Sequence, residues 1–158
     1  MAMKTYGLVL ITILAFSVAV GATTVNLVAG QYYDAGFVEV FANEEMLTIY
    51  IFTDNGWALD ETHVYVGTVA PKKSAPGQFP YKHEDLGNAL FDVYEISLDE
   101  YDVVCGNELF IAVHAVVKGV DNEYGVETAW GEGDVIRADK NWAMYFTEAI
   151  ECEYLEPR

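Results

Sequence analysis

The sequence has few basic residues. Lysine and arginine together number 8, against 25 aspartate and glutamate residues, and the formal net charge of the 158-residue chain is −17. Binding to nucleic acid requires a positive surface that neutralises phosphates, so this composition argues against nucleic-acid partners and, for the same reason, against anionic lipid surfaces. Cations are the natural counterparts of such a protein, although a strong negative charge also serves simply to keep an exported protein soluble.

Known catalytic motifs are also lacking. The chain has neither the Gly-x-Ser-x-Gly turn that presents a nucleophilic serine nor a glycine-rich loop that would cradle a phosphate. A carboxylate pair for glycoside hydrolysis stays open, because such a pair is defined by distance in space rather than by spacing in the sequence. We therefore expect a protein without enzymatic activity.

Long apolar segments are absent after the first 22 residues, so we expect no transmembrane helix in the mature chain. The one apolar run, Leu8–Val20, follows a positive charge at Lys4 and leads into small residues that end at Ala22. This pattern is typical of a secretory signal peptide, and an uncleaved N-terminal anchor is the alternative. We predict a signal peptide over residues 1–22, a single domain over residues 23–158, and a location outside the cell or in the cell envelope.

Only two cysteines occur, Cys105 and Cys152. Export to an oxidising compartment predicts a disulfide between them, with two buried free thiols as the alternative. A bridge that closes a loop of nearly fifty residues stabilises a chain by about 4 kcal/mol in the chain-entropy model.

Amphipathic helical patterns are missing, whereas alternation of apolar and polar residues with a period of two is frequent. This alternation, together with turn signals between the segments, predicts an all-β fold built as an antiparallel β-sandwich of the immunoglobulin-like or jelly-roll-like kind. The expected strands are Val25–Val28, Phe37–Phe41, Met46–Thr53, Thr62–Thr68, Ala89–Leu98, Glu108–Val117 and Trp142–Cys152. Glu108–Val117 is apolar on both faces, which indicates a central strand.

The segment Pro71–Asp85 interrupts this pattern and contains three of the four prolines, so it is predicted to be a long loop. It also carries Lys72, Lys73 and Lys82, which form a basic loop on an acidic protein. We hypothesise that this loop docks on an acidic face of another copy, since head-to-tail contacts of this kind build rings or filaments.

Several phrases of the sequence occur together in a characteristic order: Leu27–Gln31, Asp54–Trp57, Glu61–Gly67, Pro76–Glu84, Ile111–Val116, Thr128–Gly133 and Trp142–Phe146. In this combination the chain resembles an uncharacterised β-sandwich module of secreted and cell-surface proteins of bacteria and archaea. The resemblance covers nearly the whole mature chain. It implies an extracellular β-domain and implies no reaction and no catalytic residues.

Three histidines are present, and with a nearby carboxylate they define a candidate metal site for zinc or copper: His63, His83, His114 and Glu61. Convergence of these residues in a cleft would make hydrolytic activity conceivable. The alternative is that each imidazole is hydrogen-bonded separately, with His114 satisfied in the core.

Acidic residues near turns suggest a calcium site at Asp54, Asp60, Glu132 and Asp134, because calcium prefers oxygen ligands from flexible acidic loops. Trp57 and Trp130 follow or flank turns and are the candidates for a platform on which a sugar ring stacks. The corresponding alternatives are a solvated acidic surface and tryptophans buried in the core. From the sequence, the expected function is a non-enzymatic secreted or cell-surface module for assembly or binding; a calcium-assisted glycan-binding module is the second hypothesis.

Overall fold

The computed structural model describes residues 21–121 and 123–152. The predicted signal peptide therefore falls, apart from its last two residues, outside the described residues. The described chain forms ten β-strands and one short 3₁₀ turn, η1. The strands are β1 (Thr23–Ala29), β2 (Tyr33–Ala42), β3 (Met46–Thr53), β4 (Trp57–Gly67), β5 (Tyr81–His83), β6 (Phe91–Ser97), β7 (Glu108–Gly119), β8 (Val126–Gly131), β9 (Asp134–Val135) and β10 (Met144–Ala149), and η1 spans Pro76–Gln78.

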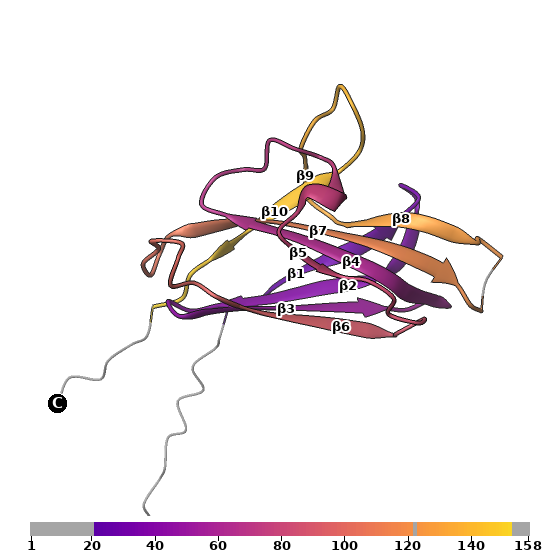
Figure 1. The fold of residues 1–158 in the computed structure, drawn as a ribbon, viewed down its shortest axis with the longest axis horizontal. Helices are drawn as coiled ribbons and strands as arrows, with labels where there is room; N and C mark the ends of the chain where they lie inside the picture. Colours follow the sequence, from indigo (N-terminus) through magenta and orange to yellow (C-terminus); the bar gives the residue numbers. More distant parts are fainter. Residues whose placement is uncertain (1–20, 122, 153–158) are drawn as a thin grey trace, which may run out of the picture.

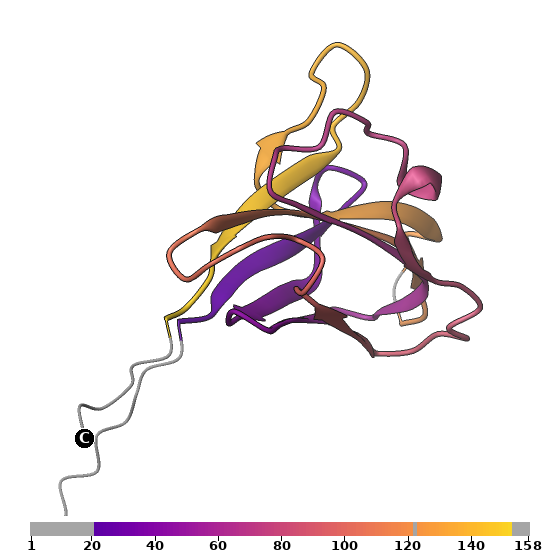
Figure 2. The ribbon, with the colours of Figure 1, turned by 60° about the vertical axis from the view of Figure 1, so that its left-hand side comes forward.

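All strand pairs are antiparallel, and eight strands follow one another in the order β5-β4-β7-β8-β1-β2-β3-β6. β10 pairs with the first part of β7 and with the short β9. The prediction of an all-β antiparallel fold is confirmed. Hydrogen bonds join the strands into a single curled sheet, in which β4, β7 and β8 lie above β1, β2, β3 and β6 (Figures 1 and 2).

Alternation along the strands creates the core between the two halves of the curled sheet. On β3, Leu47, Ile49 and Ile51 are fully buried, and Val38 and Val40 are buried opposite them on β2. Most residues of β7 are buried, and β7 pairs with β4, β8 and β10, which confirms the central position predicted for Glu108–Val117.

A second, smaller cluster covers the outer face of β4, β7 and β8. Its buried members are Phe79, Ala112, Trp130 and Ala143. Phe79 comes from the proline-rich segment, and Ala143 comes from the connection between β9 and β10, so two long loops pack over this face. Both loops project from the same side of the sheet (Figures 1 and 2).

The predicted loop Pro71–Asp85 requires a correction, because it contains η1 and the short strand β5. β5 begins directly after Pro80 and contains no proline, so its backbone can complete the hydrogen bonds to β4. β8 was not predicted. Its burial pattern does not alternate, and its sequence ends in Ala129, Trp130 and Gly131, which are all buried.

Candidate functional site

The structure brings two of the three histidines together. His63 on β4 lies directly opposite His114 on β7, and the Nδ1 atoms of the two rings are 3.1 Å apart. Both residues are 6% exposed, and the ring of His114 also packs against Trp130 at a centroid distance of 4.9 Å. One Nδ1 carries a proton and donates it to the other, because a hydrogen bond between two imidazoles needs one donor and one acceptor.

Burial keeps this histidine pair neutral. It lowers the pKa of His114 to about 3, and the neighbouring His63 contributes to that shift. Burial also lowers the pKa of His63, although the carboxylates of Glu61 and Glu84 partly counteract the shift and the ammonium of Lys82 adds to it. A neutral imidazole has one lone pair that can accept a proton or bind a metal. Because the two Nδ1 atoms are hydrogen-bonded to one another, the pair leaves one such nitrogen, Nε2 of the ring that donates.

The third histidine, His83, lies at a different place. His83 pairs with Thr62 across β5 and β4, and Thr62 faces the opposite side of the sheet from its neighbour His63. The three imidazoles of the candidate metal site therefore do not converge. Within residues 21–121 and 123–152, no group of three or more histidine, cysteine, aspartate or glutamate side chains is arranged to hold a metal ion.

His83 belongs instead to a polar seam, defined here as Thr62, His83, Asp92 and Tyr94, where the two ends of the curled sheet meet. His83 Nδ1 lies 3.0 Å from both carboxylate oxygens of Asp92, and its ring stacks on Tyr94 at 4.3 Å. The Thr62 hydroxyl donates to Asp92 Oδ2 at 2.5 Å and lies 2.7 Å from the Tyr94 hydroxyl. Burial raises the pKa of Tyr94 to about 12, so its hydroxyl remains protonated and available for these bonds.

The four candidate calcium ligands do not form one site. They are Asp54, Asp60, Glu132 and Asp134. Asp60 forms an ion pair with Lys118, at 2.6 Å, and Lys118 pairs with the first residue of β8. Glu132 follows the last residue of β8 and accepts a hydrogen bond from Asn26. The two ends of this six-residue strand are about 17 Å apart at the usual rise per residue, so the predicted calcium set is divided into two separate places.

Neither tryptophan predicted as a sugar platform is accessible. Trp57 is 1% exposed and packs against Tyr33 and Tyr124, and Trp130 is 3% exposed beneath Phe79. A stacking platform must present an open ring face to its ligand, so this assignment is corrected: both indoles are core residues.

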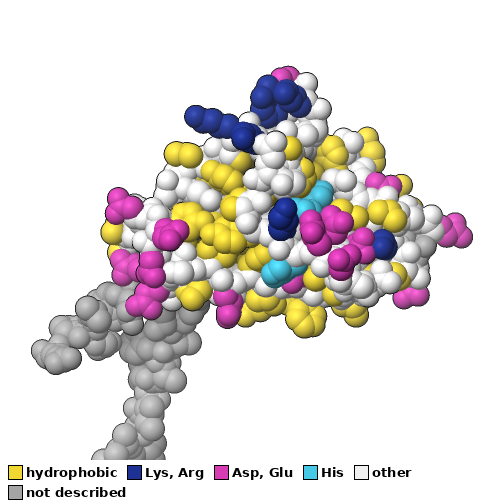
Figure 3. Space-filling view, viewed as in Figure 1, with side chains coloured by type: hydrophobic (Ala, Val, Ile, Leu, Met, Phe, Trp, Pro, Cys, Tyr) yellow, Lys and Arg dark blue, Asp and Glu magenta, His cyan; other side chains and the backbone are white. Residues whose placement is uncertain are grey.

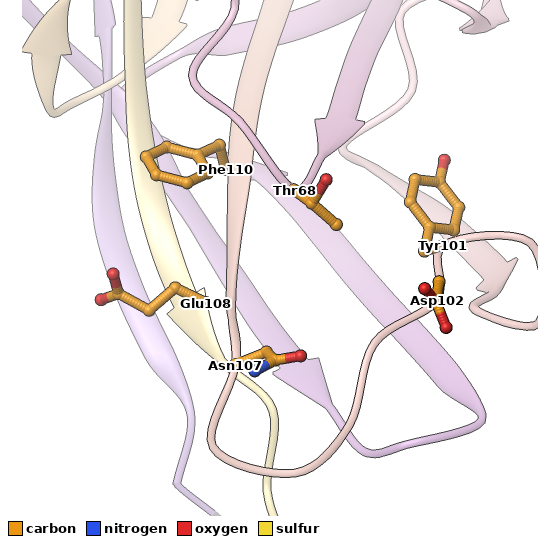
Figure 4. Close-up of a pocket in the computed structure, with 6 residues that line it drawn as sticks. All are labelled: Thr68, Tyr101, Asp102, Asn107, Glu108 and Phe110. Atoms are coloured by element: carbon orange, nitrogen blue, oxygen red, sulfur yellow. The ribbon is translucent and has the colours of Figure 1, made fainter.

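A hollow of about 490 Å³ lies beside the loop that contains Cys105. It is lined by Thr68, Tyr101, Asp102, Asn107, Glu108 and Phe110. Figure 4 shows that the carboxylates of Asp102 and Glu108 lie on opposite sides of the hollow, and they do not point toward one another. The hollow therefore offers no paired carboxylates for acid–base chemistry in this arrangement. The predicted disulfide is confirmed nearby, because Cys105 and Cys152 are bonded and their Cα atoms are 4.6 Å apart.

Positive charge is concentrated in the two loops that cover β4, β7 and β8. We define the basic cap as Lys72, Lys73, Arg137 and Lys140, which are half of the lysine and arginine residues of the chain. The amide of Asn141 approaches the carbonyl of Ser74 at 3.5 Å, so the two loops lie side by side. In Figure 3, one group of lysine and arginine side chains lies at the top of the molecule, over these loops, whereas the other basic side chains on this face lie lower, among acidic ones.

Two of the three predicted assembly lysines belong to this cap. Lys82 lies on β5, opposite His63 of the histidine pair. The carboxylates of Glu61 and Glu84 also influence the pKa of that imidazole. Arg137 and Lys140 were missed from the sequence, because they are about 65 residues away from Lys72 and only the fold brings the loops together. Within the cap, Arg137 forms an exposed ion pair with Asp139, at 2.9 Å.

The outer side of β2, β3 and β6 carries a second surface, the aromatic face, which was not among the predicted sites. It consists of Phe37, Phe41, Tyr50, Phe52 and Phe91, with Glu39, Thr48 and Glu95 beside them. The rings form a connected series: Phe37 stacks on Phe52 at 4.8 Å, and Phe52 stacks on Tyr50 at 6.1 Å. A shallow hollow of about 500 Å³ opens between Glu39, Thr48 and three of the rings. The alternation of aromatic and aliphatic residues along Met46–Thr53 was the sequence signal for this surface.

Comparison of the chain with protein-family models, with curated proteins and with solved structures finds no match. The resemblance to a secreted surface module accordingly stays a prediction. In the part of the chain that the structure describes, no helix has the length and apolar character needed to span a membrane.

Proposed function

We propose that this chain is an exported, non-enzymatic module that assembles with other copies through its basic cap. The finer fold class, a β-sandwich of the immunoglobulin-like or jelly-roll-like kind, belongs to this proposal and is supported by the core between the two halves of the curled sheet. The disulfide between Cys105 and Cys152 fits an oxidising compartment outside the cytosol.

The separation of charge carries the proposal. A chain with a formal charge of −17 holds four cationic side chains in two adjacent loops at one side of the molecule. Proline and the packing of Phe79 fix the first loop on the sheet, so its lysines project from a supported position rather than from a free tail. Opposite surface potentials attract copies to one another and orient their encounter.

The buried polar groups of the described residues make contacts within the fold. The histidine pair is buried and internally hydrogen-bonded, and the polar seam uses its hydroxyls and carboxylate to join two strands. The proposal therefore rests on the exposed charged surface rather than on these groups.

Analytical ultracentrifugation of the exported protein tests the proposal. We expect its average mass to rise with protein concentration in about 20 mM NaCl and to return to the monomer value in about 500 mM NaCl, because salt screens exposed charges. The double substitution Lys72→Glu/Lys73→Glu weakens association roughly tenfold or more at low salt, whereas Lys82→Glu, which reverses one charge in the same way on β5, has little effect. The intact mass of the same sample shows whether the chain begins at Thr23. A protein that remains monomeric at every salt and protein concentration contradicts the proposed function.

A further inference from the structure

We infer that the aromatic face receives the basic cap of a second copy, so that copies join head to tail; this inference rests on the proposed function. The face is the natural counterpart of the cap for three reasons: its exposed rings, its charges and its position in the molecule.

The rings of the aromatic face remain accessible to solvent. Phe37 is 38% exposed and Phe91 is 61% exposed, and both lie in one row with Phe52 across three neighbouring strands. Isolated exposed apolar residues are ordinary on protein surfaces, but a contiguous group of large rings marks an interaction site. The edge strand β6 carries part of this group, which makes the face reachable from outside the sheet.

The charges on the aromatic face favour a cationic partner. β2, β3 and β6 contain no lysine or arginine, and Glu39 and Glu95 place carboxylates among the rings. Lysine and arginine side chains are attracted both to the faces of aromatic rings and to carboxylates. The cap supplies these side chains together with Val69, which is 60% exposed and extends the contact with an apolar group. Each chemical feature of one surface thus has its complement on the other.

The two surfaces point in opposite directions. The cap covers the outer side of β4, β7 and β8, whereas the aromatic face is the outer side of β2, β3 and β6, in the other half of the curled sheet (Figure 1). A copy cannot place its own cap on its own face. Contacts between two different surfaces are heterologous, and they produce open chains of subunits unless the rotation between copies closes a ring.

Reversal of charge on both surfaces tests the inference. The cap variant is Lys72→Glu/Lys73→Glu, and the face variant is Glu39→Lys/Glu95→Lys, which retains every ring. In each variant alone, the cap and the face of neighbouring copies carry charge of the same sign and repel one another. We therefore expect a dissociation constant at least tenfold higher for each variant in low salt. In an equimolar mixture, the acidic cap of one variant faces the basic face of the other and the remaining pair is native, so association returns to within a few-fold of the native protein.

Two controls accompany this experiment. Asp121→Lys/Glu123→Lys makes the same change of charge at the β7–β8 turn and leaves association nearly unchanged. The single substitution Phe91→Ser removes an exposed ring without a change of charge and weakens association several-fold. Circular dichroism confirms that each variant is folded.

The outcomes separate the inference from the proposed function. If the native protein does not associate, the proposed function fails and the inference fails with it. If the cap variant loses association while the face variant retains it, the cap is an assembly surface but its receptor lies elsewhere, and the inference is wrong. Failure of the mixture to recover association contradicts head-to-tail pairing. A further outcome concerns carbohydrate. If soluble β-glucan in a native gel retards the native protein but not Phe91→Ser, and the two proteins associate equally, the aromatic face is a carbohydrate platform and the inference is wrong.

Discussion

At the scale of single residues, the histidine pair shows how a buried polar group is accommodated by a sheet. His63 and His114 are cross-strand neighbours, and each satisfies the other across 3.1 Å. Buried polar side chains without partners destabilise a fold by about 1–3 kcal/mol, so the pairing removes a penalty that either residue alone would carry. The same pairing disfavours the state in which both rings are positively charged, because the two Nδ1–H groups would then point at one another.

The histidine pair predicts a loss of stability in acid. Folding lowers the pKa of His114 to about 3 from an ordinary value near 6.5, so the unfolded chain binds a proton that the folded chain rejects. This stability is fully present above about pH 6.5 and declines as the pH falls, by about 3 kcal/mol at about pH 4. Denaturation in urea across this range measures the loss. The substitution His114→Asn lowers stability at neutral pH but flattens the decline. The carboxylates titrate alike in the native protein and in His114→Asn. If the free energy of unfolding therefore falls with pH in parallel for the two proteins, His114 is not the cause of the decline.

At the scale of strands and loops, the sequence was most informative where apolar and polar residues alternate. Met46–Thr53 was predicted with its bounds as β3, and Glu108–Val117 differs from β7 only at its end. β8 was missed because its burial depends on the loops that cover Trp130, and those loops come from distant parts of the chain. β5 was hidden inside a proline-rich segment, where only three residues complete the edge of the sheet.

The candidate sites were harder to predict, because the sequence does not show which side chains meet or which become covered. Trp57 and Trp130 have the chemistry of a sugar platform, but their exposure is decided by Tyr124 in one case and by Phe79 in the other. His63 and His83 are separated by 20 positions and lie near neighbouring strands, yet the period of two along β4 directs them to opposite sides. The cysteine pair was predictable, since two cysteines in an exported chain allow a single intramolecular pairing.

The polar seam is the element that closes the curled sheet, and it provides a second prediction. Thr62→Val removes the hydroxyl that joins Asp92 and Tyr94 while it preserves the shape of the side chain. We expect the free energy of unfolding to fall by about 2 kcal/mol, because a largely buried carboxylate and a buried phenol each lose a partner. Thr128→Val on β8 is the matched control, since Thr128 is exposed, and its effect stays within about 0.5 kcal/mol. Equal urea midpoints and slopes for the two variants would show that the seam contributes nothing to closure.

At the scale of the whole molecule, the dominant property is the excess of negative charge. On the face drawn in Figure 3, carboxylates lie in several places, while the cationic side chains of the cap lie at one side. Repulsion among like charges destabilises the compact state, and its range is set by the ionic strength. Added salt therefore weakens the proposed association between copies and, by screening repulsion within the chain, raises the stability of each folded copy.

This opposition predicts that stability and association respond to salt in opposite directions. We expect the unfolding temperature of a dilute, monomeric sample to rise by a few degrees between about 20 and 500 mM NaCl, as screening relieves repulsion within the folded chain. Thermal unfolding followed by circular dichroism measures this shift, while ultracentrifugation of a concentrated sample follows the loss of association over the same range. Choline chloride at equal ionic strength serves as the control, because general screening does not depend on the identity of the cation. A much larger rise with calcium chloride at matched ionic strength would contradict screening as the cause, since only a specific site on the acidic surface distinguishes calcium from a monovalent ion.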